Sequence, residues 1–130
     1  MAGVIVADTL QDGAGNSTAM DNAIYGSAKA WVNFAGATGT INASYNVSSI
    51  TRGGAGVYQV NFTNAFADNK YCVTAGVSTE SGTQSSIVNL FCVSGGTSTA
   101  PTTTYFQFVV QKFNTANNQD PVYMCISVNR

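Results

Sequence analysis

Residues 30–62 read AWVNFAGATGTINASYNVSSITRGGAGVYQVNF and carry the strongest indication of the fold. Its pattern predicts three β-strands joined by two glycine-rich turns, with Arg52 as the one charged residue. Apolar residues alternate with Thr, Asn and Ser through TINASYNV, residues 40–47, which is typical of an antiparallel strand with one buried face. RGGAG, residues 52–56, predicts a hairpin turn, because glycine adopts positive φ without steric cost.

The alternation also predicts which side chains of these strands face the core. They are Ala28, Ala30, Val32, Phe34, Ile41, Ala43, Tyr45, Val47, Tyr58, Val60 and Phe62. The second half of the chain repeats the pattern in YCVTAGVS, SSIVNLFCV, TTYFQFVVQKF and VYMCISVNR. Several short strands at this spacing, without a long helical pattern, predict an all-β fold. We expect an antiparallel β-sandwich of about seven strands, jelly-roll or immunoglobulin-like, over residues 27–130.

Residues 1–26 differ from the rest of the chain. An apolar GVIVA segment is followed by DTLQDGAGNSTAMDNAIYGS, which holds three of the six acidic residues. A helical turn is expected in this second piece, with Ser17 or Thr18 as its cap and Gly26 as its end. We interpret residues 1–26 as an N-terminal attachment arm that gains order against a partner. Its predicted contact residues are Val4, Ile5, Val6 and Leu10.

Charge is scarce throughout the sequence. Charged residues make up 8% of the 130 residues, against about 25% in an average globular domain, and the net charge is −1. The five cations are scattered, which argues against nucleic-acid binding. No apolar run has the length of a membrane span, and the first residues lack the basic segment of a secretory signal. We therefore expect a folded domain with a neutral surface that binds neither nucleic acid nor a membrane.

The residue types that catalysis needs are sparse. The chain has no histidine, which excludes Ser-His-Asp and Cys-His catalytic sets. Asp68, Glu80 and Asp120 fall in predicted turns, where aspartate commonly has a structural role, and a glycosidase-type carboxylate pair is the alternative. The glycine-rich segments lack the residues of a phosphate-binding loop, and no calcium-loop motif is present. We expect a protein without enzyme activity, cofactor or metal.

Three cysteines, Cys72, Cys92 and Cys125, each lie within a predicted strand. An odd number cannot pair completely within one chain, and there is neither a C-x-x-C pair nor a histidine to complete a zinc site. We expect small buried hydrophobic side chains in a reducing compartment. A disulfide between two of them is the alternative.

Trp31 is the most informative single residue for function. The alternation puts it on the opposite face of its strand from Val32 and Phe34. Three interpretations stay open: a break in register that returns the side chain to the core, a contact between subunits, or a platform on which a ligand such as a sugar stacks. Tyr25 and Tyr105 are the other aromatic residues that we assign to oligomer or ligand contacts.

Several of these motifs occur together in an order that resembles a known family. Ala-Trp-Val-Asn-Phe at residues 30–34 is followed by a glycine turn, Asn-Val-Ser-Ser-Ile at 46–50, a second glycine turn and Tyr-x-Val-Asn-Phe at 58–62. This pattern resembles a β-domain of tailed bacteriophages that occurs in tail-fibre proteins and in small virion proteins. The resemblance covers residues 25–78 well and the end of the chain loosely.

The resemblance implies a non-enzymatic structural protein of the virion, made in the cytoplasm of the bacterial host. It implies a homo-oligomer, most commonly a trimer, with other capsid, tail or fibre proteins as partners. The first expectation is a small fibre or tail component that attaches through its N-terminal arm and contacts the host surface, including its glycans. Two alternatives remain: a capsid decoration protein, favoured by the small size, and a carbohydrate-binding module. The step from phage domain to glycan binding is an analogy at the level of the fold.

Overall fold

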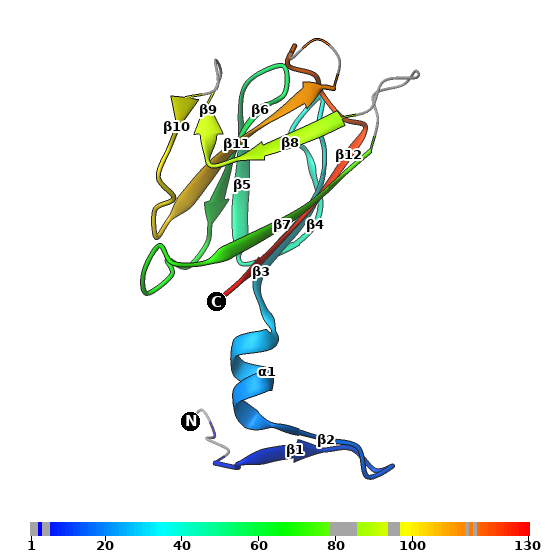
Figure 1. The fold of residues 1–130 in the computed structure, drawn as a ribbon, viewed down its shortest axis with the longest axis vertical. Helices are drawn as coiled ribbons and strands as arrows, with labels where there is room; N and C mark the ends of the chain where they lie inside the picture. The colour runs from blue at the N-terminus through cyan, green and yellow to red at the C-terminus, as the bar shows by residue number, and fades with distance from the viewer. Residues whose placement is uncertain (1–2, 4–5, 79–85, 94–96, 114, 116) are drawn as a thin grey trace.

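The protein is a β-sandwich preceded by a hairpin and a short helix that lie outside it (Figure 1). In the computed structural model, the residues described are 3, 6–78, 86–93, 97–113, 115 and 117–130. Two four-stranded antiparallel sheets pack against each other. The predicted all-β antiparallel sandwich is therefore confirmed.

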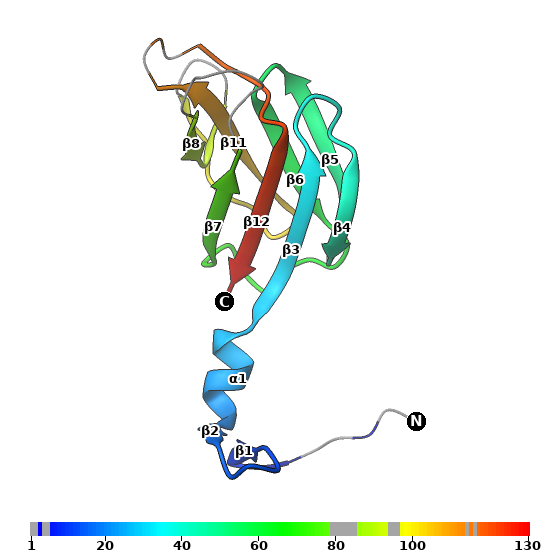
Figure 2. The ribbon, with the colours of Figure 1, turned by 90° about the vertical axis from the view of Figure 1, so that its right-hand side faces the viewer.

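The first sheet has the strand order β4-β3-β12-β7 and the second has the order β5-β6-β11-β8. The strands of the first sheet are β3 (Ala28–Ala35), β4 (Ile41–Tyr45), β7 (Cys72–Val77) and β12 (Tyr123–Asn129). Those of the second sheet are β5 (Val47–Gly54), β6 (Val57–Phe62), β8 (Ser86–Leu90) and β11 (Tyr105–Lys112). Figure 2 shows the first sheet in front, with β12 between β3 and β7. The last strand in the sequence, β12, thus lies inside the first sheet, beside the first strand of the sandwich, β3.

A small two-stranded ribbon accompanies the second sheet. It consists of β9 (Cys92–Val93) and β10 (Thr97–Ser98), which pair antiparallel. The chain leaves β8 through Phe91, whose φ of 56° is unusual for a residue with a side chain. Figure 1 places the ribbon at the margin of the sandwich, beside β11.

The core lies between the two sheets and is rich in aromatic rings. Phe34 of β3 contacts Tyr58 of β6, with 5.4 Å between ring centroids, and Tyr58 lies 5.2 Å from Phe108 of β11. Edge-to-face and offset ring pairs of this kind add about 0.5–1.5 kcal/mol each beyond the area they bury. The other core residues with essentially no exposed surface are Ala30, Val32, Val60, Phe106, Val110, Met124 and Val128. The alternation predicted for β3 and β6 is confirmed by this burial.

The face assignment for β4 was wrong at two positions. Ala43 and Tyr45 were expected in the core, but both are exposed. The register between β3 and β4 shifts between Asn33 and Phe34, so that one additional residue of β4 is accommodated by a bulge. Because side chains alternate along a strand, one additional residue turns every later side chain to the opposite face.

Asn46 is the corner at which the chain passes from the first sheet to the second. Its φ is 54°, a left-handed conformation that asparagine tolerates better than most residues. Its side-chain Nδ2 donates to the carbonyl groups of Lys29 and Asn64, and its Oδ1 accepts from the Asn64 N–H at 2.8 Å. This corner separates β4 from β5, which the sequence analysis had not counted as a strand, so the sandwich has eight strands in place of about seven.

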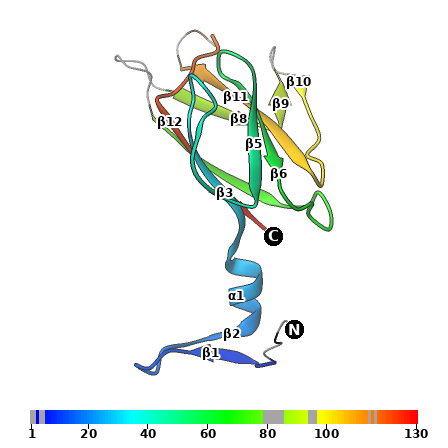
Figure 3. The ribbon, with the colours of Figure 1, turned by 180° about the vertical axis from the view of Figure 1, so that it is seen from behind.

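The N-terminal segment projects from one end of the sandwich, as Figure 3 shows from behind. It contains β1 (Thr9–Gln11) and β2 (Ser17–Ala19), which form a hairpin, followed by α1 (Met20–Gly26). The expected caps were wrong, because Ser17 and Thr18 belong to β2 and the helix begins after Ala19 without a side-chain cap. Gly26 is the last helical residue, close to where the sequence placed the end of the helix.

Candidate functional site

The outward face of the first sheet carries the most distinctive surface of the described residues. We call it the outer aromatic face. It consists of Trp31, Asn33, Ala35, Ala43, Tyr45, Thr74, Gly76, Tyr123, Cys125 and Ser127. Three large aromatic side chains are exposed there: Trp31 by 41%, Tyr45 by 59% and Tyr123 by 56%. None of the ten residues is Asp, Glu, Lys or Arg.

Strand register brings the aromatic residues to two places on this face. Trp31 of β3 lies directly opposite Tyr45 of β4, and on its other side it lies opposite Ser127 of β12. Tyr123 lies opposite Ala35, four residues further along the β3–β12 pair. At about 3.3 Å of rise per residue, the two places are about 13 Å apart. Small residues lie between the two places, so the surface between the aromatic rings is flat.

A chain of hydrogen bonds crosses the middle of the face. Asn42 Nδ2 donates to Asn33 Oδ1 at 2.7 Å, and Asn33 Nδ2 donates to Cys125 Sγ at 2.9 Å. Asn42 is the residue at the bulge of β4, so the register shift also positions its amide beside that of Asn33. These hydrogen bonds fix the orientation of the Asn33 and Asn42 amide groups between the aromatic residues.

The charged residue that lies next to this face on β3 is at the end nearest the arm. Lys29 precedes Trp31 by two residues on the same strand, and its Nζ donates to the Ile24 carbonyl and, at 2.7 Å, to Ser27 Oγ. Its ammonium group therefore ties the end of α1 to the start of β3. The remainder of the outer aromatic face offers aromatic rings, amides, hydroxyls and methyl groups.

The structure separates the residues that the sequence assigned to contacts. Trp31 is on the outer surface, which excludes the interpretation that a break in register returns it to the core, because Val32 and Phe34 on either side are buried. Tyr105 faces outward from the second sheet, where it is half-buried, on the opposite side of the sandwich. Tyr25 is in α1, and its side chain lies outside the described residues.

Tyr45 and Tyr123 were missed as surface residues by the sequence analysis. Tyr123 could have been found, because the alternation that buries Met124 and Ile126 puts Tyr123 on the opposite face. Tyr45 could not, because its orientation depends on the bulge in β4. No residue near Tyr45 has a sequence signal that marks this bulge.

The predicted contact residues of the arm that the structure describes are both exposed. Val4 and Ile5 lie outside the described residues. Val6 is 93% exposed, and Leu10 in β1 is also exposed. Ile24 of α1 adds a third exposed apolar side chain to the arm.

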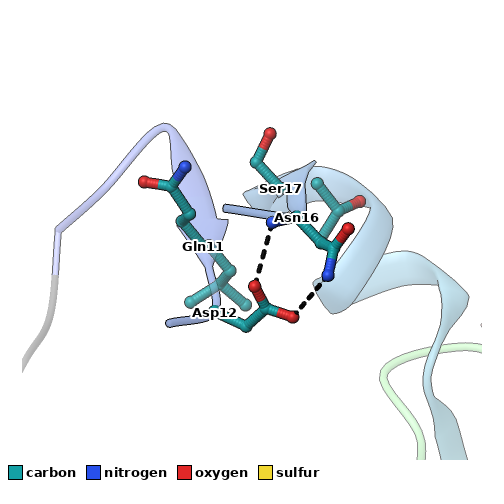
Figure 4. Close-up of a pocket in the computed structure, with 6 residues that line it drawn as sticks. Gln11, Asp12, Asn16 and Ser17 are labelled. Carbon is teal, nitrogen blue, oxygen red and sulfur yellow. Dashed lines mark hydrogen bonds between the residues drawn. The ribbon is translucent and has the colours of Figure 1, made fainter. Parts of the chain in front are cut away.

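A hollow of about 400 Å³ lies against the β1–β2 hairpin (Figure 4). It is lined by Leu10, Gln11, Asp12, Asn16, Ser17 and Thr18. Figure 4 shows the Asp12 carboxylate bonded to Asn16, with Oδ1 accepting from the backbone N–H and Oδ2 from the side-chain Nδ2. These hydrogen bonds lower the pKa of Asp12, and the bond from the Asn16 side chain has the largest effect. The polar groups of Asp12 and Asn16 thus stabilise the hairpin turn. Every residue that lines the hollow is exposed.

The acidic groups of the sandwich that are described have structural partners. Asp120 Oδ1 accepts from the Gly56 N–H at 2.8 Å and from the Tyr58 hydroxyl at 2.6 Å, and Arg52 reaches Oδ2 at 2.5 Å. Burial opposes ionisation of Asp120, but the hydrogen bonds from Arg52, Gly56 and Tyr58 together outweigh it and lower its pKa. Burial and the neighbouring Asp120 raise the pKa of Tyr58. We call Arg52, Gly56, Tyr58 and Asp120 the hairpin clasp.

Asp68 lies in the turn before β7, away from the hairpin clasp. Arg130 donates to its two carboxylate oxygens at 2.9 and 2.5 Å, and the Lys70 N–H donates at 2.8 Å. The hydrogen bond from Arg130 is the main reason that the pKa of Asp68 falls to about 2. Glu80 lies outside the described residues. Asp68 and Asp120 each bind an arginine, so both have structural roles.

The expectation for the cysteines was correct at one position only. Cys92 is buried, and burial raises the pKa of its thiol. Cys72 and Cys125 are exposed, because both occupy outward positions of the first sheet. All three are free thiols. Within the described part of the chain, no three cysteine or acidic side chains gather closely enough to hold a metal ion.

Two further observations concern the chain as a whole. Over the residues that are described, no helix combines the length and apolar character needed to cross a membrane. Comparison with family models, with curated proteins and with solved structures finds no match for this chain.

Proposed function

We propose that this protein is a non-enzymatic structural component of a tailed-phage particle, a small fibre or tail part that attaches through its N-terminal arm. The resemblance of residues 30–62 to phage β-domains supports this proposal from the sequence. The observation that carries it is the arm, residues 1–26, because its described part projects from the sandwich with exposed apolar side chains.

The arm has too few contacts of its own to be stable alone. The helix α1 has seven residues and lacks a side-chain cap, whereas isolated helices shorter than about 12–15 residues are marginal in water. An isolated two-stranded hairpin such as β1–β2 is likewise marginal. Both elements therefore gain their order by burying Val6, Leu10 and Ile24 against a partner. Other virion proteins and further copies of this chain, as in a trimer, are the partners proposed.

The chemistry of the sandwich supports an assembly role over catalysis. A glycosidase-type mechanism needs two carboxyl groups within about 5–10 Å, one of which has a raised pKa. Asp68 and Asp120 lie in separate turns, both have lowered pKa values, and each is bonded to an arginine. Their arrangement stabilises two turns.

The particle itself provides the test. A Leu10→Asn, Ile24→Asn double variant alters the arm, and Phe113→Asn is the control, since it changes an exposed apolar residue of the sandwich domain. Copies per purified particle are counted by quantitative mass spectrometry against the major capsid protein, and particle imaging gives their location. We expect few copies at the tail, at least tenfold fewer for the arm variant, and normal incorporation of the control.

Each other outcome would count against a specific part of the proposal. Hundreds of copies over the capsid would replace the fibre or tail assignment with the decoration alternative. Equal incorporation of the arm variant would contradict attachment through the arm. If the wild-type chain is absent from particles, the virion assignment is wrong, and the carbohydrate-binding module becomes the leading alternative.

A further inference from the structure

The outer aromatic face has a composition that narrows the chemistry of what it can bind. We propose that it binds a neutral saccharide chain, with Trp31 and Tyr45 at one end of the contact and Tyr123 at the other. This goes beyond the proposed function, because it concerns a different surface from the arm and can be tested on the protein alone.

Exposed aromatic rings make this face suitable for contact with a saccharide. Trp31 and Tyr45 are cross-strand neighbours, and both keep about half of their side-chain surface in water. Exposed large aromatic groups gathered on one face commonly mark a contact surface. A tryptophan or tyrosine side chain offers a flat apolar ring with a polar group at its edge. The C–H face of a sugar ring is complementary to such a ring.

The residues between the aromatic groups are small or polar. Ala35, Ala43 and Gly76 have little or no side chain, so a ligand can approach the sheet closely between the rings. Asn33 and Asn42 present amides that their mutual hydrogen bond and the bond to Cys125 hold in place. Ser127 and Thr74 add hydroxyls in the row that contains Trp31. Fixed amides and hydroxyls suit a ligand whose own hydroxyl groups both donate and accept.

Charge decides between the classes of ligand. Nucleic acids and anionic polysaccharides require cations on the surface that binds them. Among the described residues, Lys29 is the cation on the strand of Trp31, and Ile24 and Ser27 hold it at the end beside the arm. Arg130, which directly follows β12, is bonded to Asp68. A second copy of the chain is the other neutral partner. Interfaces between identical subunits are about 65% apolar, whereas amides, hydroxyls and a thiol occupy the middle of this face. The face therefore matches a neutral saccharide better than another copy.

The spacing of the rings adds a requirement on ligand length. The strand register puts Tyr123 about 13 Å from the Trp31–Tyr45 pair along the sheet. A single sugar ring reaches one of these places only. The face is therefore expected to prefer an oligosaccharide over its monosaccharide.

The binding experiment uses the full-length protein and an array of neutral, sialylated and sulfated oligosaccharides. The best neutral chain is then titrated in solution. Trp31 is the only tryptophan, so its fluorescence reports directly on contact with this face. We expect saturable binding of a neutral chain, a change in Trp31 emission, and at least tenfold weaker binding of the monosaccharide.

Variants then locate the binding surface. Trp31→Ala is expected to weaken binding by at least tenfold, and Phe113→Ala, which removes an exposed ring elsewhere, is expected to leave it unchanged. Ala43→Arg is a second variant that blocks the space between the rings and retains all three of them. Circular dichroism melting shows whether each variant is folded, and Ala43→Arg tests the surface if Trp31→Ala fails to fold.

Several results would overturn the inference. They are the absence of binding to any neutral chain at millimolar concentration, binding restricted to charged chains, and full binding by the folded Ala43→Arg variant. Light scattering provides a further one: an oligomer of the wild-type protein that Ala43→Arg disrupts would show that another copy covers this face. None of these results depends on incorporation into particles, so the inference and the proposed function can fail separately.

Discussion

The hairpin clasp gives the sharpest prediction about stability, through the substitution Asp120→Ala. The Asp120 carboxylate joins the β5–β6 hairpin to the segment before β12, which the chain reaches more than 60 residues later. Its removal leaves the Gly56 N–H, which is buried, without an acceptor among the described residues. The Tyr58 hydroxyl keeps a second acceptor, since the Gly36 carbonyl lies 2.9 Å away.

These contacts set the size of the effect. A buried donor without an acceptor costs about 1–3 kcal/mol. The Tyr58 hydroxyl exchanges a charged acceptor for a neutral one, which costs about 1 kcal/mol. Arg52 is about one-third exposed and regains water, so loss of its ion pair adds less than about 1 kcal/mol. We expect the free energy of unfolding to fall by about 3 kcal/mol, which corresponds to a Tm lower by about 10 °C.

Urea unfolding followed by circular dichroism measures this change, and Asp120→Asn is the matched control. Asparagine retains an oxygen that can accept from Gly56 and Tyr58, so its cost should be about half that of alanine. The pKa of Asp120 is lowered in the folded state, so its stabilising effect is present above about pH 4 and is lost as the pH falls through its folded pKa. The difference between wild type and Asp120→Ala should therefore shrink in acid. A loss below about 0.5 kcal/mol at pH 7 would show that these hydrogen bonds of Asp120 contribute little to stability.

Three further predictions concern other turns and corners. Because Arg130 lowers the pKa of Asp68 to about 2, Asp68→Asn should remove the part of the Tm decline that falls between about pH 4 and pH 2, and an unchanged acid limb in a Tm–pH series would contradict this. Gly56→Ala should prevent stable folding, since φ is +65° and the added Cβ would lie 2.3 Å from the backbone oxygen of Val110. Gly13→Ala is the control, because the space around Gly13 is open, and it should be expressed and unfold at the wild-type Tm. Asn46→Ala should lower the free energy of unfolding, measured in urea, by about 2 kcal/mol. Asn46→Gly should lower it less, because glycine adopts the left-handed conformation although it lacks the three side-chain hydrogen bonds. Equal losses for the two variants would show that φ is unimportant at this corner.

The strands whose burial followed a simple alternation were predictable from sequence. In β3 and β6, and in β11 apart from the buried Val109, the inward residues are apolar or aromatic and the outward ones mostly polar, so the period of two identified both the strand and its core face. The position of Trp31 outside the core followed from this alternation. Of the three exposed aromatic residues of the candidate face, the sequence analysis therefore identified Trp31 of β3.

The rest of that face depended on contacts between distant segments. Tyr45 reaches the surface because a bulge in β4 shifts its register against β3, and Tyr123 joins Trp31 because the last strand of the chain pairs with the first strand of the sandwich. The partners of Asp68 and Asp120 are likewise distant, since Arg130 and Arg52 lie more than 60 residues away along the chain. Local propensity has no information on such pairings.

The all-β class, the scarcity of charge and most of the core were predictable from sequence, because they follow from the composition and from an alternation within most of the strands. The turn at Asn46 from one sheet to the other, the strand order, and the set of aromatic side chains that share a surface depend on the three-dimensional packing. Those features depend on which strands pair and on a register that one residue shifts. A one-residue shift exchanges the inner and outer faces of a strand, which is why Tyr45 became part of the candidate binding surface.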